Sequence, residues 1–324
     1  MRKILVLGTG GTISCKESAD GLTPALSVSE LVQATESGKS LPVEISAEQL
    51  FELDSTNMTS RHWEAAAKRI HERYDEFDGF VVTHGTDTMG YAAASLSCLI
   101  RNSRKPIALT GSMLPLSANG SDAPKNLRDA VMFAADERAF GVRVVFSGKI
   151  FDGRCAVKLD TSSEDSFVSV NNANVGVITC ADKLRYNEMG SEKYSGETRF
   201  YERLSDDVFL VKLIPGQALS IPENARVVII ESYGNGGVPD YLMSGVQRLA
   251  EKGVYIIVAT QCRFGSTDLR RYEVGHKAAE RFSLLETGEM TVEYAVARAR
   301  WALEYSKDFD GFCEMFYEEN GKQR

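Results

Sequence analysis

The sequence predicts an α/β fold, with a larger N-terminal domain built on a mostly parallel sheet flanked by helices and a smaller C-terminal α/β domain. Two observations lead to this prediction. Short runs rich in Val, Ile and Leu alternate along the chain with segments of helical spacing. The runs are apolar throughout, rather than at every second position, which is typical of parallel strands that are buried on both faces.

Six of these runs are predicted strands, and most end in a glycine or in polar residues that would begin a turn. In chain order they are KILVLG from Lys3, GFVVTHG from Gly79, KPIALTG from Lys105, VRVVFSG from Val142, ARVVIIES from Ala225 and VYIIVATQ from Val254. Because parallel strands end at the same edge of a sheet, ligands are expected at the turns that follow them.

Two helices have predicted starting points between these strands. One begins after Thr59, a good N-cap residue, and the other begins after Asp122, with Pro124 tolerated in its first turn. A further helix is expected to run from Asp87 to Ile100. The residues that would share the buried face of the first helix are Trp63, Ala67, Ile70 and Tyr74.

The composition changes between Lys183 and Asp207, where the chain is polar, charged and without periodicity. We interpret this stretch as an interdomain linker. The predicted division is an N-terminal catalytic α/β domain at 1–185, a linker at 186–207 and a C-terminal α/β domain at 208–324, which ends in helices.

Charge and cysteine content restrict the class of protein. A net charge of −8 argues against a general nucleic-acid binder. The six cysteines are widely spaced, without a C-x-x-C pair, which suits a reducing compartment. The apolar run after Arg2 and Lys3 is only four residues long, and no window reaches membrane-spanning length. We expect a cytoplasmic protein without a membrane or nucleic-acid partner.

The turn after the first predicted strand, GTGGTIS from Gly8, raises the question of phosphate binding. A dinucleotide fingerprint beginning at Gly8 requires glycine at position 13, where this chain has Ile13. A helix should then follow, but residues 14–27 are polar and contain glycine and proline, so we expect a mobile loop there. The chain also has no P-loop motif. These features exclude the nucleotide interpretation.

The same turn can instead present Thr12 for chemistry. Gly10 and Gly11 allow the backbone to bend sharply and a substrate to approach closely. The Thr12 hydroxyl is a weak nucleophile unless another group removes its proton. The alternative is that Thr12 only packs or caps at the end of a strand.

The second turn, HGTDTM from His84, together with a distant lysine, supplies candidate partners. A metal site at His84 and Asp87 lacks further ligands, since the chain has only four histidines, so we expect no metal. Asp87 either caps a helix or forms a pair with a cation. Lys158 lies among small and apolar residues before a polar turn, where a partly buried lysine beside a carboxylate can exchange protons. Its alternative is an ordinary surface lysine.

Four motifs in order resemble the bacterial-type L-asparaginases of the asparaginase/glutaminase superfamily: GTGGTIS, DSTNM, HGTDTM and AVKLDTSSEDSF. The resemblance extends over essentially the whole chain, through TGSMLP, SDAPKNLRDAV, YGNGGVPDY and TQCRFGSTDLRRYEVG. Within the family, the chain is similar to the cytoplasmic and archaeal-like branch. It implies a two-domain asparaginase-like fold, assembly as a homodimer or homotetramer, and hydrolysis of L-asparagine to L-aspartate and ammonia without a cofactor.

The resemblance also implies a role for individual residues. Thr12 would be the nucleophile that forms the acyl-enzyme, and Thr86, Asp87 and Lys158 would form a second triad that activates a hydroxyl or the attacking water. Asp87 would in addition bind the α-amino group of the substrate. The residues that would contact the rest of the substrate are Gly11, Asp54, Ser55, Thr56, Gly85 and Ser112.

One departure from the family pattern concerns a tyrosine that usually contacts the nucleophile from the loop after the first turn. The matching positions here are Leu22 and Thr23, and the first tyrosine of the chain is Tyr74. Three alternatives stay open: acylation proceeds without a loop tyrosine, a hydroxyl such as that of Thr23 replaces it, or activity is reduced or redirected. Asn235 is the nearest candidate for a residue supplied by a neighbouring subunit.

Other functions of the same fold stay open at this point. A glutaminase differs only in its substrate, whose additional methylene is worth about 1–3 kcal/mol in a pocket. The remaining alternatives are an amidotransferase-type subunit that releases ammonia and a non-catalytic amino-acid-binding protein.

Overall fold

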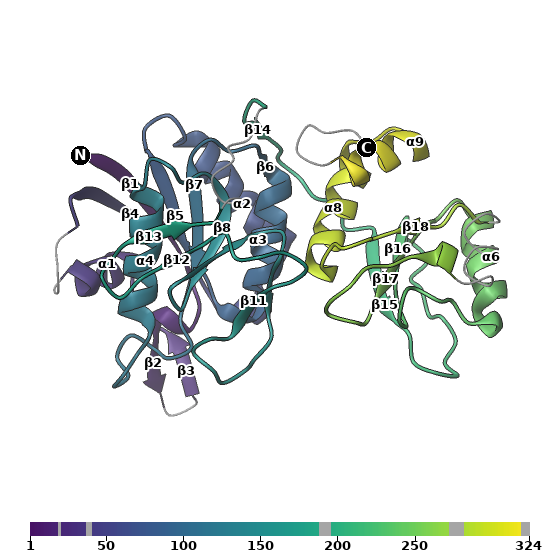
Figure 1. The fold of residues 1–324 in the computed structure, drawn as a ribbon, viewed down its shortest axis with the longest axis horizontal. Helices are drawn as coiled ribbons and strands as arrows, with labels where there is room; N and C mark the ends of the chain where they lie inside the picture. Colours follow the sequence, from purple (N-terminus) through teal and green to yellow (C-terminus); the bar gives the residue numbers. More distant parts are fainter. Residues whose placement is uncertain (19–20, 37–40, 188–195, 272–281, 319–324) are drawn as a thin grey trace. The chain divides into compact units, whose positions relative to one another are not determined.

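The structure, a computed structural model, describes residues 1–18, 21–36, 41–187, 196–271 and 282–318. The chain divides into two compact units, Met1–Arg203 and Leu204–Arg324 (Figure 1). Of the predicted linker at 186–207, residues 188–195 lie outside the described residues. Just beyond them, β14 (Arg199–Phe200) pairs with β6 (Ile100–Arg101).

The first unit is built on an eight-stranded sheet in the order β13-β12-β9-β8-β7-β5-β1-β4. The five strands from β4 to β8 in this order are parallel, whereas β9, β12 and β13 are each antiparallel to the preceding strand. The mostly parallel sheet predicted from the apolar runs is therefore confirmed. The strands are β1 (Arg2–Gly10), β4 (Val43–Leu53), β5 (Gly79–Thr83), β7 (Pro106–Thr110), β8 (Gly141–Phe146), β9 (Lys149–Asp152), β12 (Gly176–Ile178) and β13 (Leu184–Tyr186).

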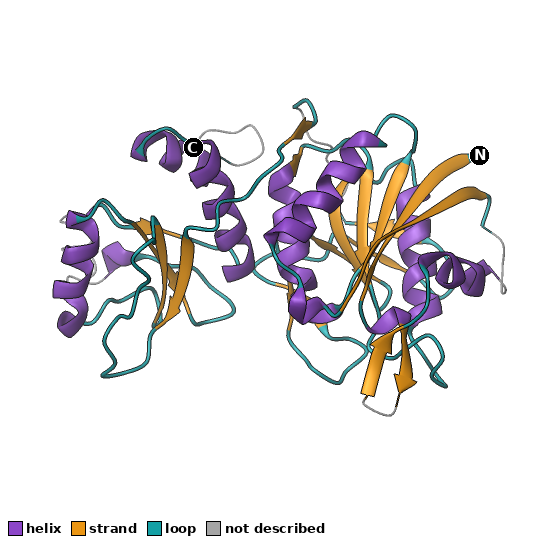
Figure 2. Cartoon of the chain, turned by 180° about the vertical axis from the view of Figure 1, so that it is seen from behind, coloured by secondary structure: helices purple, strands orange, loops and turns teal. Residues whose placement is uncertain are grey.

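Helices flank this sheet on both sides (Figures 1 and 2). They are α1 (Val28–Glu36), α2 (Ser60–Glu72), α3 (Met89–Leu99) and α4 (Ala123–Ala135). Helices α1 and α4 pack on strand residues such as Ile4, Val6 and Val81 in one core cluster. In Figure 1, α2 and α3 lie on the other side of the sheet.

The predicted start of α2 is confirmed, because Thr59 occupies its N-cap position and the backbone N–H of Thr59 donates to Nδ1 of His62 at 3.0 Å. Trp63, Ala67 and Ile70 are buried as expected. Tyr74 lies beyond the helix, which ends at Glu72, so its assignment to the helical face is wrong.

The predicted start of α4 is confirmed in position, but Asp122 does not cap the helix through its side chain. Its carboxylate instead accepts hydrogen bonds from the backbone N–H groups of Met113 and Leu114 at 2.9 to 3.1 Å. Ser121 Oγ accepts from the first N–H of the helix, that of Ala123, at 3.1 Å. Ser121 thus accepts from the first N–H group of the helix, whereas Asp122 holds the turn that contains Met113 and Leu114.

Residues 14–27, expected to form a loop, contain a β-hairpin. After a short 3₁₀ helix, η1 (Thr12–Ser14), β2 (Cys15–Ser18) pairs antiparallel with β3 (Gly21–Pro24). The loop prediction is wrong in this respect because polar residues are compatible with an antiparallel pair that faces water on one side, where Lys16 and Thr23 are exposed. A second small pair joins β10 (Ala156–Lys158) to β11 (Phe167–Ser169).

The second unit has a four-stranded sheet in the order β15-β16-β17-β18, and every pairing is parallel. Its strands are β15 (Val208–Lys212), β16 (Val227–Ser232), β17 (Tyr255–Thr260) and β18 (Leu285–Glu286). Its helices are α6 (Met243–Glu251), α8 (Val292–Tyr305) and α9 (Phe309–Tyr317), so the predicted helical end is confirmed. Across the described part of the chain, no helix has the length and apolar character needed to cross a membrane.

Candidate active site

Glycines bring together the turns that follow β1, β4 and β5. Gly11 has a φ of +83°, and a Cβ atom there would lie 2.4 Å from Cα of Gly85. A Cβ atom on Gly85 would in turn lie 2.5 Å from Oγ of Ser55. Such distances leave no room for a side chain at either glycine. The turns that carry Thr12, Ser55 and Thr86 therefore lie side by side at one edge of the sheet.

The turn after β7 lies against the same group. The backbone N–H of His84 donates to the carbonyl of Thr110 at 2.8 Å, and a Cβ atom on Gly111 would lie 2.3 Å from the carbonyl oxygen of His84. Ser112, the next residue, is buried, and its hydroxyl donates to the carbonyl of Leu114 at 2.5 Å. The predicted pocket residue Ser112 thus lies next to the turn that begins at His84.

Lys158 ends β10 and reaches the short 3₁₀ helix η3 (Thr86–Thr88) before α3. Its Nζ donates to Oγ1 of Thr86 at 2.8 Å and to Oδ1 of Asp87 at 2.7 Å. The Lys158 side chain is 16% exposed and that of Asp87 is 57% exposed. The three residues predicted as one triad are therefore in direct contact, although Lys158 is separated from the other two by some seventy positions in the sequence.

Thr12 begins η1 and is half-buried, between the buried residues Gly11 and Ile13. Ser14 closes the turn, because its backbone N–H and its hydroxyl both lie 3.0 Å from the carbonyl oxygen of Gly11, to which they donate. The hydroxyl of Thr12 forms no hydrogen bond with another described residue. The turn thus holds the backbone of Thr12 while leaving its hydroxyl available.

The turn after β4 contains Asp54, Ser55 and Thr56, three of the residues predicted to contact the substrate. Oδ1 of Asp54 accepts from the backbone N–H and from the hydroxyl of Thr56, both at 2.8 Å, and so caps η2 (Ser55–Asn57). Ser55 is buried, whereas Asp54 and Thr56 are exposed. The Thr88 hydroxyl donates to the carbonyl of Ser55 at 2.8 Å, which connects this turn to η3.

His84 is buried and both ring nitrogens have partners. Nε1 of Trp63 donates to Nε2 of His84 at 3.4 Å, so the proton of the neutral ring is on Nδ1, which donates to the carbonyl of Gly85 at 2.7 Å. Burial lowers the pKa of His84 to about 4. His84 therefore has the features of a neutral structural histidine. No group of three or more potential metal ligands occurs within the described ranges.

Two family models match the sequence. The family described as "Asparaginase, N-terminal" matches residues 3–190, and the one described as "Glutaminase/Asparaginase C-terminal domain" matches residues 207–316. The chain belongs to the asparaginase family. This agrees with the resemblance inferred from the four motifs.

Individual members of the asparaginase family agree with this assignment. An L-asparaginase of Thermococcus kodakarensis is 34% identical over 95% of this chain and 94% of its own length. One of the subunits of a glutamyl-tRNA(Gln) amidotransferase from Pyrococcus furiosus is 30% identical over 94% of this chain and 73% of its own length. The solved structure of the thermostable L-asparaginase from Thermococcus kodakarensis has a TM-score of 0.90 to this chain at 32% identity, with 98% of both chains covered.

The departure from the asparaginase pattern falls in the β2–β3 hairpin. Thr23 is exposed and its backbone pairs with that of Lys16, while the side chain of Leu22 lies outside the described residues. The three alternatives for the missing loop tyrosine therefore stay predictions. Asn235, the residue considered for a role across an assembly interface, donates from Nδ2 to the carbonyl of Ser266 at 3.2 Å within its own unit.

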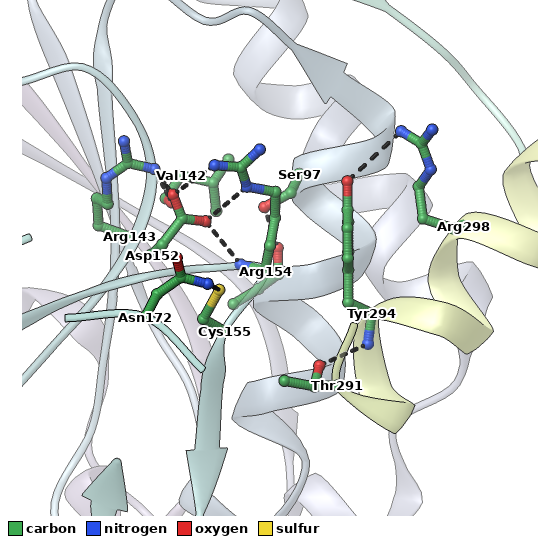
Figure 3. Close-up of polar contacts among 11 residues, drawn as sticks. Ser97, Val142, Arg143, Asp152, Arg154, Cys155, Asn172, Thr291, Tyr294 and Arg298 are labelled. Atoms are coloured by element: carbon green, nitrogen blue, oxygen red, sulfur yellow. Dashed lines mark hydrogen bonds and ion pairs between the residues drawn. The ribbon is translucent and has the colours of Figure 1, made fainter. Parts of the chain in front are cut away.

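Sequence analysis missed two groups of residues, one that holds the turn after β7 and one at the corner between β9 and β10. Asn126 is buried on α4 and donates from Nδ2 to the carbonyl of Gly111 at 3.1 Å and to Oδ2 of Asp122 at 3.0 Å. The second group consists of Arg143, Asp152 and Arg154 (Figure 3). The signals available in the sequence are an asparagine in a buried helix and an arginine inside the apolar run VRVVF.

Proposed function

We propose that this member of the asparaginase family hydrolyses the side-chain amide of L-asparagine to L-aspartate and ammonia, through an acyl-enzyme on Thr12. The observation that carries the proposal is the contact of Lys158 Nζ with both Thr86 Oγ1 and Asp87 Oδ1, at the edge of the sheet where Thr12 leaves its hydroxyl available. The identity to an archaeal L-asparaginase supports the choice of substrate.

In the first step the hydroxyl oxygen of Thr12 attacks the amide carbon and its proton passes to the leaving nitrogen. An ester forms between the substrate and Thr12, and ammonia departs. In the second step water attacks the ester carbon, the product carboxylate leaves and Thr12 regains its proton. Each step needs a group that exchanges protons beside the reacting oxygen, and we assign this task to Thr86, Asp87 and Lys158.

The other predicted site residues would bind the substrate. Asp87 is mostly exposed and can accept hydrogen bonds from the α-amino group through its remaining lone pairs. We assign the α-carboxylate to the turn of Asp54, Ser55 and Thr56, in which Ser55 is the firmest candidate. Gly11 and Gly85 would contact the substrate through their backbone groups, and Ser112 would line the pocket.

We also propose a cytoplasmic location and assembly as a homodimer or homotetramer. All six cysteines are free, which is expected of a protein from a reducing compartment. The assembly follows from the family resemblance, and light scattering on the purified protein would measure its mass.

The second candidate function is ammonia release for an amidotransferase, because the chain is 30% identical to the amidotransferase component of Pyrococcus furiosus. That relative has additional length, since the matched region covers 73% of it. We prefer the asparaginase because the identity to the L-asparaginase of Thermococcus kodakarensis is higher, at 34% against 30%. A glutaminase remains the alternative within the same chemistry.

The test is an ammonia-release assay with L-asparagine, L-glutamine, D-asparagine and free amides. We expect the highest kcat/KM with L-asparagine. A higher kcat/KM with L-glutamine than with L-asparagine would overturn the substrate assignment. Binding of either amino acid without any ammonia release would favour a non-catalytic binding protein. The full chain should be used, since both units belong to the matched family.

A further inference from the structure

A buried aspartate closes the corner between β9 and β10. Asp152 is the last residue of β9 and pairs with Arg143 of β8 in the sheet register. Its carboxylate accepts from Nε of Arg154 at 2.8 Å and from Nη2 at 2.9 Å, and it forms an ion pair with Nη1 of Arg143 at 3.0 Å (Figure 3). The backbone N–H of Arg154 donates to Oδ1 at 2.9 Å. One carboxylate at the end of β9 thus binds the Arg143 side chain of β8 and both the side chain and the backbone of Arg154 in the turn.

The rest of the corner is held by close backbone contacts. The N–H of Gly153 donates to the carbonyl of Val142 at 3.1 Å, and a Cβ atom on Gly153 would lie 2.9 Å from Oγ of Ser97 near the end of α3. The N–H of Cys155 donates to the carbonyl of Asp152 at 2.9 Å. The corner is therefore packed against both the sheet and the carboxyl end of α3.

The charges at the corner compensate one another. Burial alone would raise the pKa of Asp152, but Arg154 and Arg143 together hold it below its ordinary value. A buried carboxylate is stable only when it is paired and hydrogen-bonded in this way. Neutralising Asp152 would leave Arg143, which is itself buried, without this partner.

The short strand β10 leads from this corner to Lys158. Within the described part of the chain, β10 pairs only with β11, which lies outside the main sheet. The corner lies beside the carboxyl end of α3, whereas Lys158 contacts η3, which precedes the start of the same helix. The extended chain from the corner to Lys158 therefore spans about 15 Å. Ala156 and Val157 are buried between these points.

We propose that Asp152 is a positioning residue for Lys158, which acts by fixing the place from which β10 leaves the sheet. This inference rests on the proposed function, because it assumes that the contacts of Lys158 with Thr86 and Asp87 are used in turnover. Both contacts are between 2.7 and 2.8 Å, so a displacement of β10 by about 1 Å breaks their geometry. Misplacement on this scale can lower a rate by about 10²-fold.

The chain provides a matched control in Asp136 and Arg138. Arg138 donates to the Asp136 carboxylate from its backbone N–H at 2.8 Å, from Nε at 3.0 Å and from Nη2 at 2.7 Å, which repeats the geometry of Asp152 and Arg154. The two aspartate side chains are similarly buried, at 13% and 12% exposed. The chain after Arg138 leads into β8 and not to a residue of the candidate site.

The experiment compares Asp152→Asn with Asp136→Asn in the full chain. We expect Asp152→Asn to lower kcat with L-asparagine by about tenfold or more, with a smaller change in KM, and Asp136→Asn to stay within about twofold of wild type. Arg154→Lys keeps the charge and should lose less activity than Arg154→Gln. Equal losses of kcat in the two aspartate variants would overturn the proposal.

A second readout does not require activity. The extent of Lys158 modification by an amine-reactive reagent, quantified by mass spectrometry of the folded protein, should rise in Asp152→Asn and Arg154→Gln but not in Asp136→Asn. Unchanged Lys158 labelling would overturn the positioning role even if kcat falls. If the wild type releases no ammonia, the proposed function fails, while the labelling comparison still decides whether the corner positions Lys158.

Should Asp152→Asn fail to fold, Arg154→Gln carries both measurements. It removes the Nε and Nη2 contacts but keeps the ion pair of Asp152 with Arg143. Wild-type kcat and wild-type Lys158 labelling in a folded Arg154→Gln protein would overturn the proposal, and the combined changes described above would support it.

Discussion

Both units place the carboxyl ends of parallel strands at one edge of a sheet, yet they use the polar side chains at that edge differently. In the second unit these side chains bond to nearby backbone. Gln261 donates from Nε2 to the carbonyls of Leu213 at 2.7 Å and Glu231 at 3.0 Å, and the Thr260 hydroxyl donates to the carbonyl of Gly234 at 2.6 Å. Gln261 and Thr260 thus hold their own turns, whereas Lys212 and Glu231, near the ends of β15 and β16, form an ion pair with each other at 3.3 Å.

At the edge of the first unit, some side chains do the same and others do not. The hydroxyls of Thr88 and Ser112 donate to backbone carbonyls. Thr12 leaves its hydroxyl available, and Lys158, Thr86 and Asp87 bond to one another rather than to the backbone. The parallel-sheet topology is common to both units, so the topology alone does not make a site. The difference is that the first edge has polar side chains that are held in place without donating to backbone carbonyls.

The largest effect that would test this comparison is the loss of turnover at the first edge. We expect Thr12→Ala and Lys158→Met each to lower kcat by about 10³-fold or more, because one removes the proposed nucleophile and the other the cation beside Thr86 and Asp87. The midpoint of urea unfolding should change little, since the Thr12 hydroxyl bonds to no other described residue and the carboxylate that pairs with Lys158 is mostly exposed. Steady-state ammonia release and denaturant curves measure the two quantities.

Lys149→Met is the matched control for the lysine. Lys149 forms an ion pair with Asp165 at 2.5 Å, but it contacts no residue of the candidate site in the described structure. Its kcat should stay within about twofold of wild type, as expected for an exposed pair. Near-normal turnover of Thr12→Ala would show that the nucleophile is another residue.

Much of this edge could be predicted from the sequence, because the relevant signals are local. Apolar runs predict β1, β5 and β7, and a Gly-Thr pattern after a strand predicts a turn that presents a hydroxyl. The pairing of Lys158 with Thr86 and Asp87 is not local: the residue types make Lys158 a candidate cation for this turn, and the family resemblance groups the three residues as one triad. Side-chain spacing within a sequence contains no information on a contact across seventy positions.

The parts that could not be predicted have physical reasons of the same kind. Strand β4 is only partly buried along its length and contains three glutamates, as edge strands often do, so it lacks an apolar run. Asp122 has the sequence position of a helix cap, shortly before Pro124. In the structure its carboxylate instead accepts from the backbone N–H groups of Met113 and Leu114, which only the folded chain brings close. The corner at Asp152 arises from the β8–β9 pairing that brings Arg143 alongside.

A smaller effect concerns His84, a polar group at the first edge whose two ring nitrogens both have hydrogen-bond partners. Its folded pKa of about 4 lies below the ordinary 6.5, so between these values the unfolded chain binds the proton and the folded chain does not. The free energy of unfolding should therefore fall as pH drops from about 6.5 to 4, by about 3 kcal/mol from this group. Urea unfolding at several pH values measures the slope.

His84→Asn is the control, because its amide can still donate to the Gly85 carbonyl but does not titrate. The difference between the two pH profiles isolates the contribution of His84 from that of the carboxylates. Identical profiles would mean that the imidazole is solvated enough to be protonated in the folded state.

The smallest effect belongs to the second edge, where Gln261 serves only its own turns. Gln261→Met keeps the length of the side chain but leaves the Leu213 carbonyl without its amide donor, whereas the Glu231 carbonyl still accepts from the N–H of Leu213 at 3.0 Å. We expect a loss of about 1–2 kcal/mol in the free energy of unfolding of this unit. Fluorescence of Trp301, which is buried in α8, reports this unit in a Trp63→Phe background.

Gln247→Met is the matched substitution, since Nε2 of Gln247 donates to Oε1 of Glu251 on the exposed side of α6 at 2.8 Å. It should change the free energy of unfolding by less than about 0.5 kcal/mol. If Gln261→Met is as mild as Gln247→Met, the amide of Gln261 does not stabilise the second edge. Its hydrogen bonds would then be replaceable by water, and the contrast between the two edges would rest on Thr260 and Ser232, whose hydroxyls donate to the carbonyls of Gly234 and Gly237.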